Sequence, residues 1–229
     1  MELQKHTVGG DYSRDVWLLP GPQDQPHRLC VFLDGEHYIR DLQAVPILEE
    51  LLDCGAIPPA TCVFVSHVSS AARHEDYVWN NRYADFIAND LVRWAKEQVP
   101  SIQADDHFIG GLSLSGLAAA HIALRHPDLF SRVLCQSGSF WWLADHALDL
   151  PTTQARFWLS VGDEETATEI SHPPSGLYQR ISQIEGVKLA AQRLEALGAT
   201  IKLNVYPGGH AAAPWKAELG PALRWLFES

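Results

Sequence analysis

The sequence predicts an α/β protein with a mostly parallel central sheet and helices on both of its faces. Segments with strand-like and helix-like hydrophobic patterns alternate along the 229 residues, which is the order expected of this class. The central strand candidates are almost continuously apolar and show little alternation with polar residues. Such strands are buried on both faces, as in a parallel sheet covered by crossover helices.

Each element follows from the local pattern of apolar residues. In the first helical segment, Asp41 is the expected N-cap and Gly55 the glycine just after the helix. The predicted strands are residues 14–20, 28–35, 61–68, 107–113, 131–139, 155–163 and 200–210, and the predicted helices are residues 41–55, 83–100, 115–127, 187–198 and 214–228.

Two segments, residues 69–82 and 164–186, lie outside this alternation. Both follow strands at the end where open α/β sheets bind their ligands, and long connections there are often functional. We expect 164–186 to be a loop insertion, whose Pro-rich stretch at 171–176 could serve as a lid or an interface.

Composition limits the fold and its partners. The chain is 46% hydrophobic and long enough for one large core, so we expect one domain over residues 1–229. A net charge of −11 argues against nonspecific binding to nucleic acid or to an anionic membrane, because both need a cationic surface. The sequence leaves the oligomeric state open, with a homodimer among the alternatives.

The cysteines and the N-terminal segment favour a reduced, cytoplasmic setting. Cys30, Cys54, Cys62 and Cys135 lack CxxC spacing and lie in or beside apolar runs, so we expect them to act as small hydrophobic residues. The chain begins without an apolar leader, and no run approaches the ~20 apolar residues of a membrane span.

The corner between residues 107–113 and 115–127 carries the strongest chemical signal. Gly111-Leu112-Ser113-Leu114-Ser115 matches G-x-S-x-G with serine in place of the second glycine. In that motif a strand turns sharply into a helix and holds the central serine exposed as a nucleophile, which is typical of α/β hydrolases. Centring the motif on Ser115 would put Leu117 where a small residue is needed, so we predict Ser113 as the nucleophile.

The remaining members of a triad are expected on loops after later strands, in the order acid and then histidine. His210 follows the last strand, beside two glycines that permit a tight loop, and is the predicted general base. Asp163, Glu164 and Glu165 follow an earlier strand, and only one of the three can face the imidazole. Their positions along the chain do not show which of the three is the triad acid.

Four segments resemble the esterase family that contains esterase D (S-formylglutathione hydrolase) and the enterochelin esterases. The enterochelin esterase branch is the more similar, and the resemblance covers about residues 14–228. Its "SQSGS(F/Y)WW" element is specific to this neighbourhood. The segments are "VFLDGEHY", "ARHEDYVWNNRYADFIANDLVRW", "IGGLSLSGLAAAHIALRHPDLFSRVLCQSGSFWW" and "GGHAAAPWKAELGPALRWLF".

The resemblance implies roles for individual residues. Glu165 takes the position of the family's acid, and Leu114 with Gly35 or Glu36 supplies the oxyanion hole through backbone N–H groups. Arg73 is implied as a residue that holds an anionic substrate or orders the pocket; its alternative is a loop arginine paired with Glu75 or Asp76. Trp141 and Trp142 could wall an aromatic-binding cleft, or they could pack against the sheet.

Together these observations predict a serine esterase that hydrolyses a small-molecule carboxylic ester through an acyl-enzyme. A catecholate-siderophore ester is one expected substrate. The family usually has an acidic residue where this chain has Ala211, so the sequence does not decide on that substrate. The alternatives are a general carboxylesterase, a feruloyl or acetyl esterase, or a non-catalytic hydrolase-fold binding module. We expect no metal and no cofactor, because the histidines show no HExxH spacing.

Overall fold

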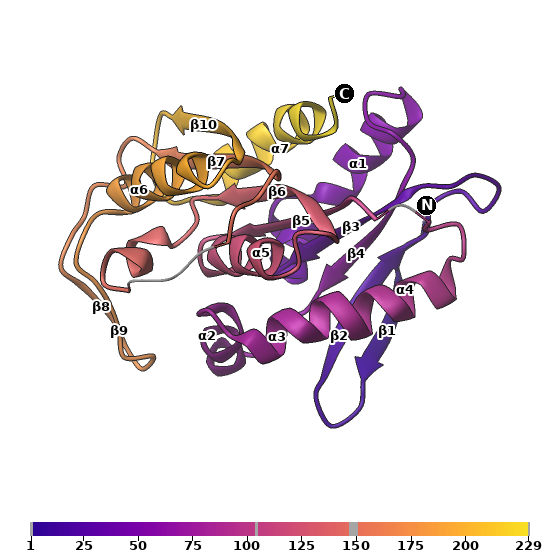
Figure 1. The fold of residues 1–229 in the computed structure, drawn as a ribbon, viewed down its shortest axis with the longest axis horizontal. Coiled ribbons are helices and arrows are strands. Elements are labelled where there is room, and N and C mark those ends of the chain that lie inside the picture. Colours follow the sequence, from indigo (N-terminus) through magenta and orange to yellow (C-terminus); the bar gives the residue numbers. More distant parts are fainter. Residues whose placement is uncertain (1, 104, 147–150, 229) are drawn as a thin grey trace.

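The computed structural model describes residues 2–103, 105–146 and 151–228, which form an eight-stranded sheet between two layers of helices (Figure 1). The strand order is β1-β2-β4-β3-β5-β6-β7-β10. Pairing is parallel from β4 to β10, whereas β1 and β2 are antiparallel at one edge. The strands are β1 (Gln4–Gly9), β2 (Ser13–Leu19), β3 (Arg28–Leu33), β4 (Ala60–Val65), β5 (His107–Leu112), β6 (Phe130–Gln136), β7 (Arg156–Gly162) and β10 (Thr200–Tyr206).

The two helix layers close separate hydrophobic cores against the sheet. One core contains Ile109, Leu117 and Phe157 and lies under α2 to α6; the other contains Phe108 and Leu219 and lies under α1 and α7. Full burial of one such side chain contributes about 1.5–3 kcal/mol. The helices are α1 (Ala44–Asp53), α2 (Ser70–Tyr77), α3 (Asn81–Asp85), α4 (Val92–Gln98), α5 (Leu114–Arg125), α6 (Gln183–Ala196) and α7 (Ala212–Phe227), with short helical segments η1 (His37–Asp41), η2 (Phe86–Leu91) and η3 (Phe140–Ala144).

The predicted α/β class, with a mostly parallel sheet and helices on both faces, is therefore confirmed. The apolar strands are continuous because they are covered from both sides; β4 and β5 are buried along their whole length. Within the described ranges, no helix combines the length and apolar character that a membrane crossing requires. The thiols of Cys30, Cys62 and Cys135 are buried, while Cys54 is exposed.

Two local predictions at the first helix were wrong, and one edge strand was missed. Helix α1 begins at Ala44 after Gln43, and Asp41 does not cap it, because the Asp41 carboxylate accepts hydrogen bonds from His37 and Arg40. The edge strand β1 has no continuous apolar run and was not predicted.

The two segments outside the alternation also contain regular structure. Residues 69–82 include helix α2, whose N-cap Ser69 accepts a hydrogen bond from Ala72 N–H. Residues 164–186 contain an antiparallel hairpin, β8 (Ile170–His172) and β9 (Leu177–Gln179), and the first turn of α6. A capping box between Ser182 and Glu185 starts α6 before the predicted residue 187.

Candidate active site

The carboxyl ends of β3, β5, β7 and β10 lie at one edge of the sheet, since these strands are parallel. Ser113 follows β5, Glu165 follows β7 and His210 follows β10, while Asp34 follows β3. An open α/β sheet binds its ligands at this edge. Sheet topology therefore brings together residues that are distant in sequence.

Ser113 occupies a strained turn between β5 and α5. Its backbone has φ 55° and ψ −122°, a conformation that costs a non-glycine residue about 1–3 kcal/mol. The turn is so tight that a Cβ on Gly111 would lie 2.1 Å from the Ser115 carbonyl oxygen. Only glycine fits at 111, which explains the first position of the motif.

The two serines of the motif have different environments. Ser115 is fully buried, and its hydroxyl donates to the Leu112 carbonyl and accepts from the Leu112 N–H, both at 2.8 Å. Ser113 caps α5 without a side-chain hydrogen bond to the helix and borders the cavity. Ser115 therefore fastens the turn, while the Ser113 hydroxyl is available for chemistry.

His210 and Glu165 form a short hydrogen bond across the same edge. The Nδ1 atom of His210 lies 2.6 Å from Glu165 Oε2, and the two side chains are 42% and 3% exposed. Asp163 instead accepts from the Gly208 N–H at 2.9 Å, and Glu164 is exposed. Of the three consecutive acids, Glu165 is thus the one that faces the imidazole.

Neutral donors hold the second oxygen of Glu165. Oε1 accepts hydrogen bonds from Ser137 Oγ at 2.7 Å, the Gly162 N–H at 2.8 Å and Tyr206 OH at 3.1 Å. Burial alone would raise the pKa of this carboxyl, but the His210 contact and these donors hold it below its ordinary value. Glu165 is therefore kept ionised in a buried position.

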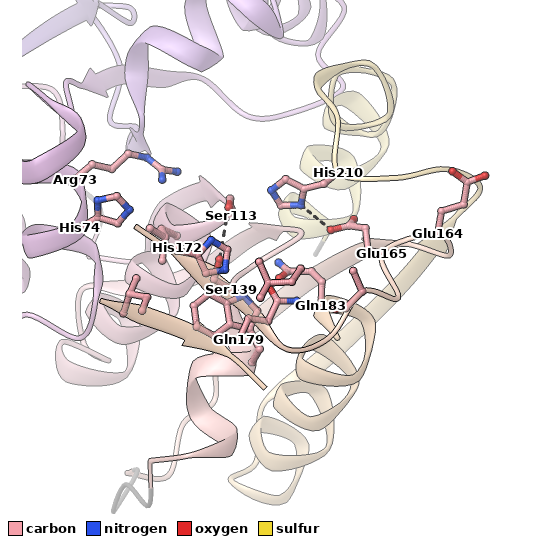
Figure 2. A pocket seen from close by; sticks show the side chains of 15 residues that line it. Arg73, His74, Ser113, Ser139, Glu164, Glu165, His172, Gln179, Gln183 and His210 are labelled. Carbon is pink, nitrogen blue, oxygen red and sulfur yellow. Dashed lines mark hydrogen bonds and ion pairs between the residues drawn. The ribbon is translucent and has the colours of Figure 1, made fainter. Parts of the chain in front are cut away.

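Ser113 and His210 border one cavity of about 420 Å³. Figure 2 shows His210 between Glu165 and Ser113, with one ring nitrogen directed at Glu165. Within the described ranges, the hydrogen-bond partner of Ser113 Oγ is Ser139 Oγ at 3.5 Å, and no direct bond to His210 is formed. Such bonds are often long before substrate binds.

The predicted oxyanion donors are placed differently. Leu114 borders the cavity and is the first residue of α5, so its N–H has no acceptor within the helix. Gly35 and Glu36 follow β3 at the same edge of the sheet, but they are not among the described residues that line the cavity.

Arg73 lies in α2 and borders the cavity, but its partner is Asp34. Its Nε and Nη2 atoms contact Asp34 Oδ1 at 2.9 Å and Oδ2 at 2.6 Å. The alternative pairing with Glu75 or Asp76 is wrong, since Asp76 accepts from Arg14 instead. The guanidinium of Arg73 therefore brings positive charge to the cavity, and the Asp34 carboxylate partly neutralises it.

The opposite wall is formed by an aromatic residue and the β8–β9 hairpin. Trp141 is 3% exposed and stacks on His172 of β8, with ring centres 5.3 Å apart and planes 7° apart. Gln179 of β9 and Gln183 of α6 add amide groups to this wall. Trp142 stacks on Trp79 and His146 instead, and it does not border the cavity within the described ranges.

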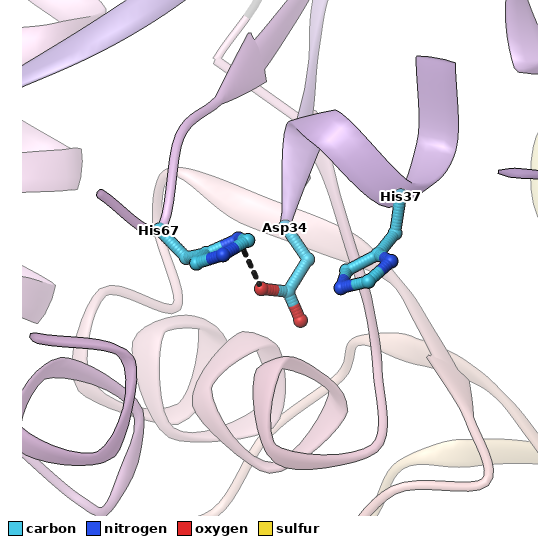
Figure 3. A group of neighbouring side chains, drawn as sticks. All are labelled: Asp34, His37 and His67. Carbon is cyan, nitrogen blue, oxygen red and sulfur yellow. Dashed lines mark ion pairs between the residues drawn. The ribbon is translucent and has the colours of Figure 1, made fainter. Parts of the chain in front are cut away.

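A second cluster at this edge has residue types that bind metals. Asp34, His37 and His67 offer ligand atoms within 4.8 Å of one another (Figure 3). Arg73 already contacts both oxygens of Asp34, and His67 Nδ1 lies at ion-pair distance from Asp34 and Glu36. A metal ion would have to displace Arg73 and the proton of His67, so the cluster is best described as an ion-pair network.

Several residues at the site were missed by sequence reasoning. Ser137, Tyr206 and Trp215 form a hydrogen-bonded group behind Glu165, in which Trp215 Nε1 donates to both hydroxyls. Ser137 falls within the "QSGS" element that carried the family resemblance, which was the available signal. Tyr206 and Trp215 carry no local motif, because only the fold brings them to Glu165.

Comparison with known proteins identifies the family of the chain. The family model described as "Putative esterase" matches residues 7–226. The iron(III) enterobactin esterase of Dickeya dadantii is 28% identical over 95% of this chain and 52% of its own length. The chain therefore spans about half the length of this curated relative.

Solved structures of other proteins share the fold. The enterobactin esterase of Shigella flexneri, crystallised in the presence of enterobactin, superposes with a TM-score of 0.83 at 24% identity, over 99% of this chain and 59% of that one. The BES protein from Bacillus cereus superposes with a TM-score of 0.72 at 18% identity, over 100% of this chain and 95% of that one. By the match over residues 7–226, the chain belongs to the "Putative esterase" family.

Proposed function

We propose that the chain is a serine esterase in which Ser113, His210 and Glu165 form the catalytic triad. His210 Nε2 takes the proton from Ser113, whose oxygen attacks the ester carbonyl and forms an acyl-enzyme with release of the alcohol. Glu165 holds Nδ1 of the ring and stabilises the imidazolium that forms. His210 then activates a water molecule, which releases the acid and restores Ser113.

Backbone N–H groups stabilise the negative charge on the tetrahedral intermediate. Leu114 N–H at the start of α5 is the first donor, aided by the positive end of the helix dipole. The second is expected from the loop after β3, at Gly35 or Glu36. Each donor is worth about 3 kcal/mol of transition-state stabilisation.

One observation carries this proposal. A serine whose hydroxyl makes no hydrogen bond to its own helix is held in a strained turn, and it borders the same cavity as a histidine that is 2.6 Å from a buried carboxylate. Strain of that kind is retained where the surrounding structure and function require it. A binding module would need neither the strained serine nor the short histidine–carboxylate hydrogen bond.

We further propose an ester of the enterobactin and salmochelin type as the substrate, because relatives of the chain are an iron(III) enterobactin esterase of Dickeya dadantii and an iron(III) salmochelin esterase of Escherichia coli. The cavity suits an ester with a planar apolar group and an anionic or phenolic group, since Trp141 and His172 form one wall while Arg73 borders another part. A cytoplasmic location and one hydrolase domain over residues 1–229 belong to the same proposal.

The proposal is tested by hydrolysis of p-nitrophenyl acetate and butyrate by Ser113→Ala. We expect kcat to fall by about 10⁵-fold, while the far-ultraviolet circular dichroism spectrum is unchanged. The matched control is Ser115→Ala, which removes the buried hydroxyl and loses about 1 kcal/mol of stability. Undiminished turnover by Ser113→Ala would refute the triad.

The substrate is tested with a panel containing a linear catechol-serine ester, a ferulate ester and short acyl esters. We expect the highest kcat/KM for the catechol-serine ester. A clear preference for the ferulate or short acyl esters would support the proposed esterase activity but contradict the proposed siderophore substrate.

A further inference from the structure

The loop after β3 is fixed by two buried or half-buried carboxylates. Asp34 has φ 56° and a side chain that is 0% exposed, and both of its oxygens contact Arg73. Glu36 turns back toward the loop after β4, where Ser66 Oγ donates to Oε1 and His67 N–H donates to Oε2 at 3.3 Å. Between them, a Cβ on Gly35 would lie 2.8 Å from the Phe64 carbonyl carbon.

His67 is the side chain that contacts both carboxylates. Its Nδ1 lies 3.3 Å from Asp34 Oδ1 and 3.1 Å from Glu36 Oε2. Figure 3 shows the His67 ring on one side of Asp34 and His37 on the other. His67 therefore connects the loop after β4 to both ends of residues 34–36, the loop from which the second oxyanion donor is expected.

The charges around His67 come from three neighbouring elements. Residues 34–36 contribute Asp34 and Glu36, η1 contributes His37 with ring centres 5.6 Å apart, and α2 contributes Arg73 through Asp34. His37 Nδ1 is itself directed at Asp41, at 2.7 Å. Two carboxylates thus face His67 and Arg73, and the group is neutral only when His67 is protonated.

Contacts with Asp34 and Glu36 outweigh burial and raise the pKa of His67 to about 9. Burial alone would raise the pKa of Asp34, but His67 and Arg73 lower it to about 2. The pKa of Glu36 is also lowered to about 2, since His67 and Ser66 outweigh its burial. Two carboxylates within 3.3 Å of Nδ1 thus favour the protonated form of His67 at neutral pH.

We propose that the imidazolium of His67 is a positioning residue that holds residues 34–36, and with them the backbone donor of the oxyanion hole, in the reactive arrangement. This inference rests on the proposed esterase function. When His67 loses its proton, Glu36 loses the cation that faces it, and Asp34 keeps only Arg73. The two carboxylates then repel each other. The transition state then loses a fixed donor, while substrate binding at Trp141 and His172 is unaffected.

The test compares His67→Gln with wild type between pH 6.5 and 10.5, with the Ser113→Ala rate subtracted as background. We expect kcat of His67→Gln to be about tenfold lower at pH 7.5, with KM changed less than twofold. Wild-type kcat should fall reversibly above pH 9, and His67→Gln should lack this fall. His67→Lys, which keeps a cation, should recover most of the lost kcat.

The matched control is His126→Gln, because His126 has the same 22% side-chain exposure as His67 and pairs with Asp85 at 3.0 Å away from the cavity. We expect its kcat and pH profile to equal those of wild type. A kcat for His67→Gln within twofold of wild type, or an unchanged fall above pH 9, would overturn the inference.

Two measurements keep the inference falsifiable if His67→Gln does not fold. A wild-type kcat that is flat from pH 7 to 10.5 would contradict it. NMR of the histidine side chains in Ser113→Ala measures the protonation of His67 independently of catalysis. We expect one histidine resonance to titrate near pH 9. Titration of all histidines below pH 7.5 would overturn the inference. Full activity of Ser113→Ala would instead reject the esterase mechanism itself.

Discussion

Two carboxylate–histidine assemblies stand at the same edge of the sheet, and they differ in how many charges face the histidine. His210 faces one carboxylate, Glu165, and is 42% exposed at the cavity. His67 faces two carboxylates, Asp34 and Glu36, and is 22% exposed. The first arrangement leaves a ring nitrogen free for substrate, whereas the second commits the ring to an ion-pair network.

The comparison shows that the charged groups and hydrogen-bond donors around a histidine determine its role. Glu165 gains most of its other hydrogen bonds from neutral donors, so His210 is the cation that forms when the reaction needs one. Asp34 and Glu36 both lie within ion-pair distance of His67 Nδ1, at 3.3 and 3.1 Å, so these two carboxylates favour the protonated ring. The same pair of residue types therefore suits proton transfer at one position and structural support at the other.

The largest effect is expected when His210 is removed. His210→Ala should lower kcat by about 10⁵-fold, because Ser113 then has no base to accept its proton. The change should cost little stability, since the ring is substantially exposed. Ester hydrolysis and a thermal melt measure both quantities. A smaller loss than in His67→Gln would reverse the roles assigned to the two histidines.

Glu165→Gln should have the next largest effect, a fall in kcat of about 10⁴-fold. The amide keeps the shape of the side chain but cannot stabilise the imidazolium. As controls, Asp163→Asn and Glu164→Gln should stay within threefold of wild type, because neither contacts His210. A larger loss in Glu164→Gln than in Glu165→Gln would show that the wrong acid has been assigned.

The fold was largely predictable, because buried parallel strands and amphipathic helices have strong local patterns. The strands from β3 to β7 were found within a few residues of their bounds. Strand β1 was missed because it lies at the sheet edge, where its side chains alternate in exposure and need no apolar run. Asp41 was misread as a cap because its real partners, His37 and Arg40, form salt bridges that the sequence does not reveal.

The site was predictable only where a motif accompanied the chemistry. Ser113 and His210 follow strands in the expected order, and both border the cavity. The choice of Glu165 needed a family resemblance, because three consecutive acids look alike in sequence. His67, Ser137 and Tyr206 act through contacts between distant elements, so no local pattern marks them.

Tyr206→Phe should have a moderate effect on stability and on the pH dependence of kcat. Removing the hydroxyl takes one donor from Glu165 and one acceptor from Trp215, which costs about 1 kcal/mol of stability. The pKa of Glu165 should rise, since that donor stabilises the charged form. The acid limb of the kcat profile should therefore move to higher pH; an unmoved limb would remove Tyr206 from the support of Glu165.

The pH dependence of stability should show the smallest effect. Asp34 and Glu36 have pKa values of about 2 when folded, below ~3.9 and ~4.3 when unfolded, so their stabilisation is lost as pH falls from about 4 toward 2. The pKa of His67 is about 9 when folded and ~6.5 when unfolded, so its stabilisation is lost as pH rises from about 6.5 through 9.

The melting temperature of wild type minus that of His67→Gln should accordingly be largest near pH 5–6 and vanish by about pH 10. Thermal melts across that range measure it. A difference that grows with pH would mean that His67 is neutral in the folded protein.

The most direct measurement of the central claim is mass spectrometry of the protein after reaction with a fluorophosphonate. We expect one adduct per chain, on the peptide that contains Ser113, with labelling abolished in Ser113→Ala and strongly slowed in His210→Ala. An adduct on another serine, or equal labelling of Ser113→Ala, would contradict the assignment of this serine as the nucleophile.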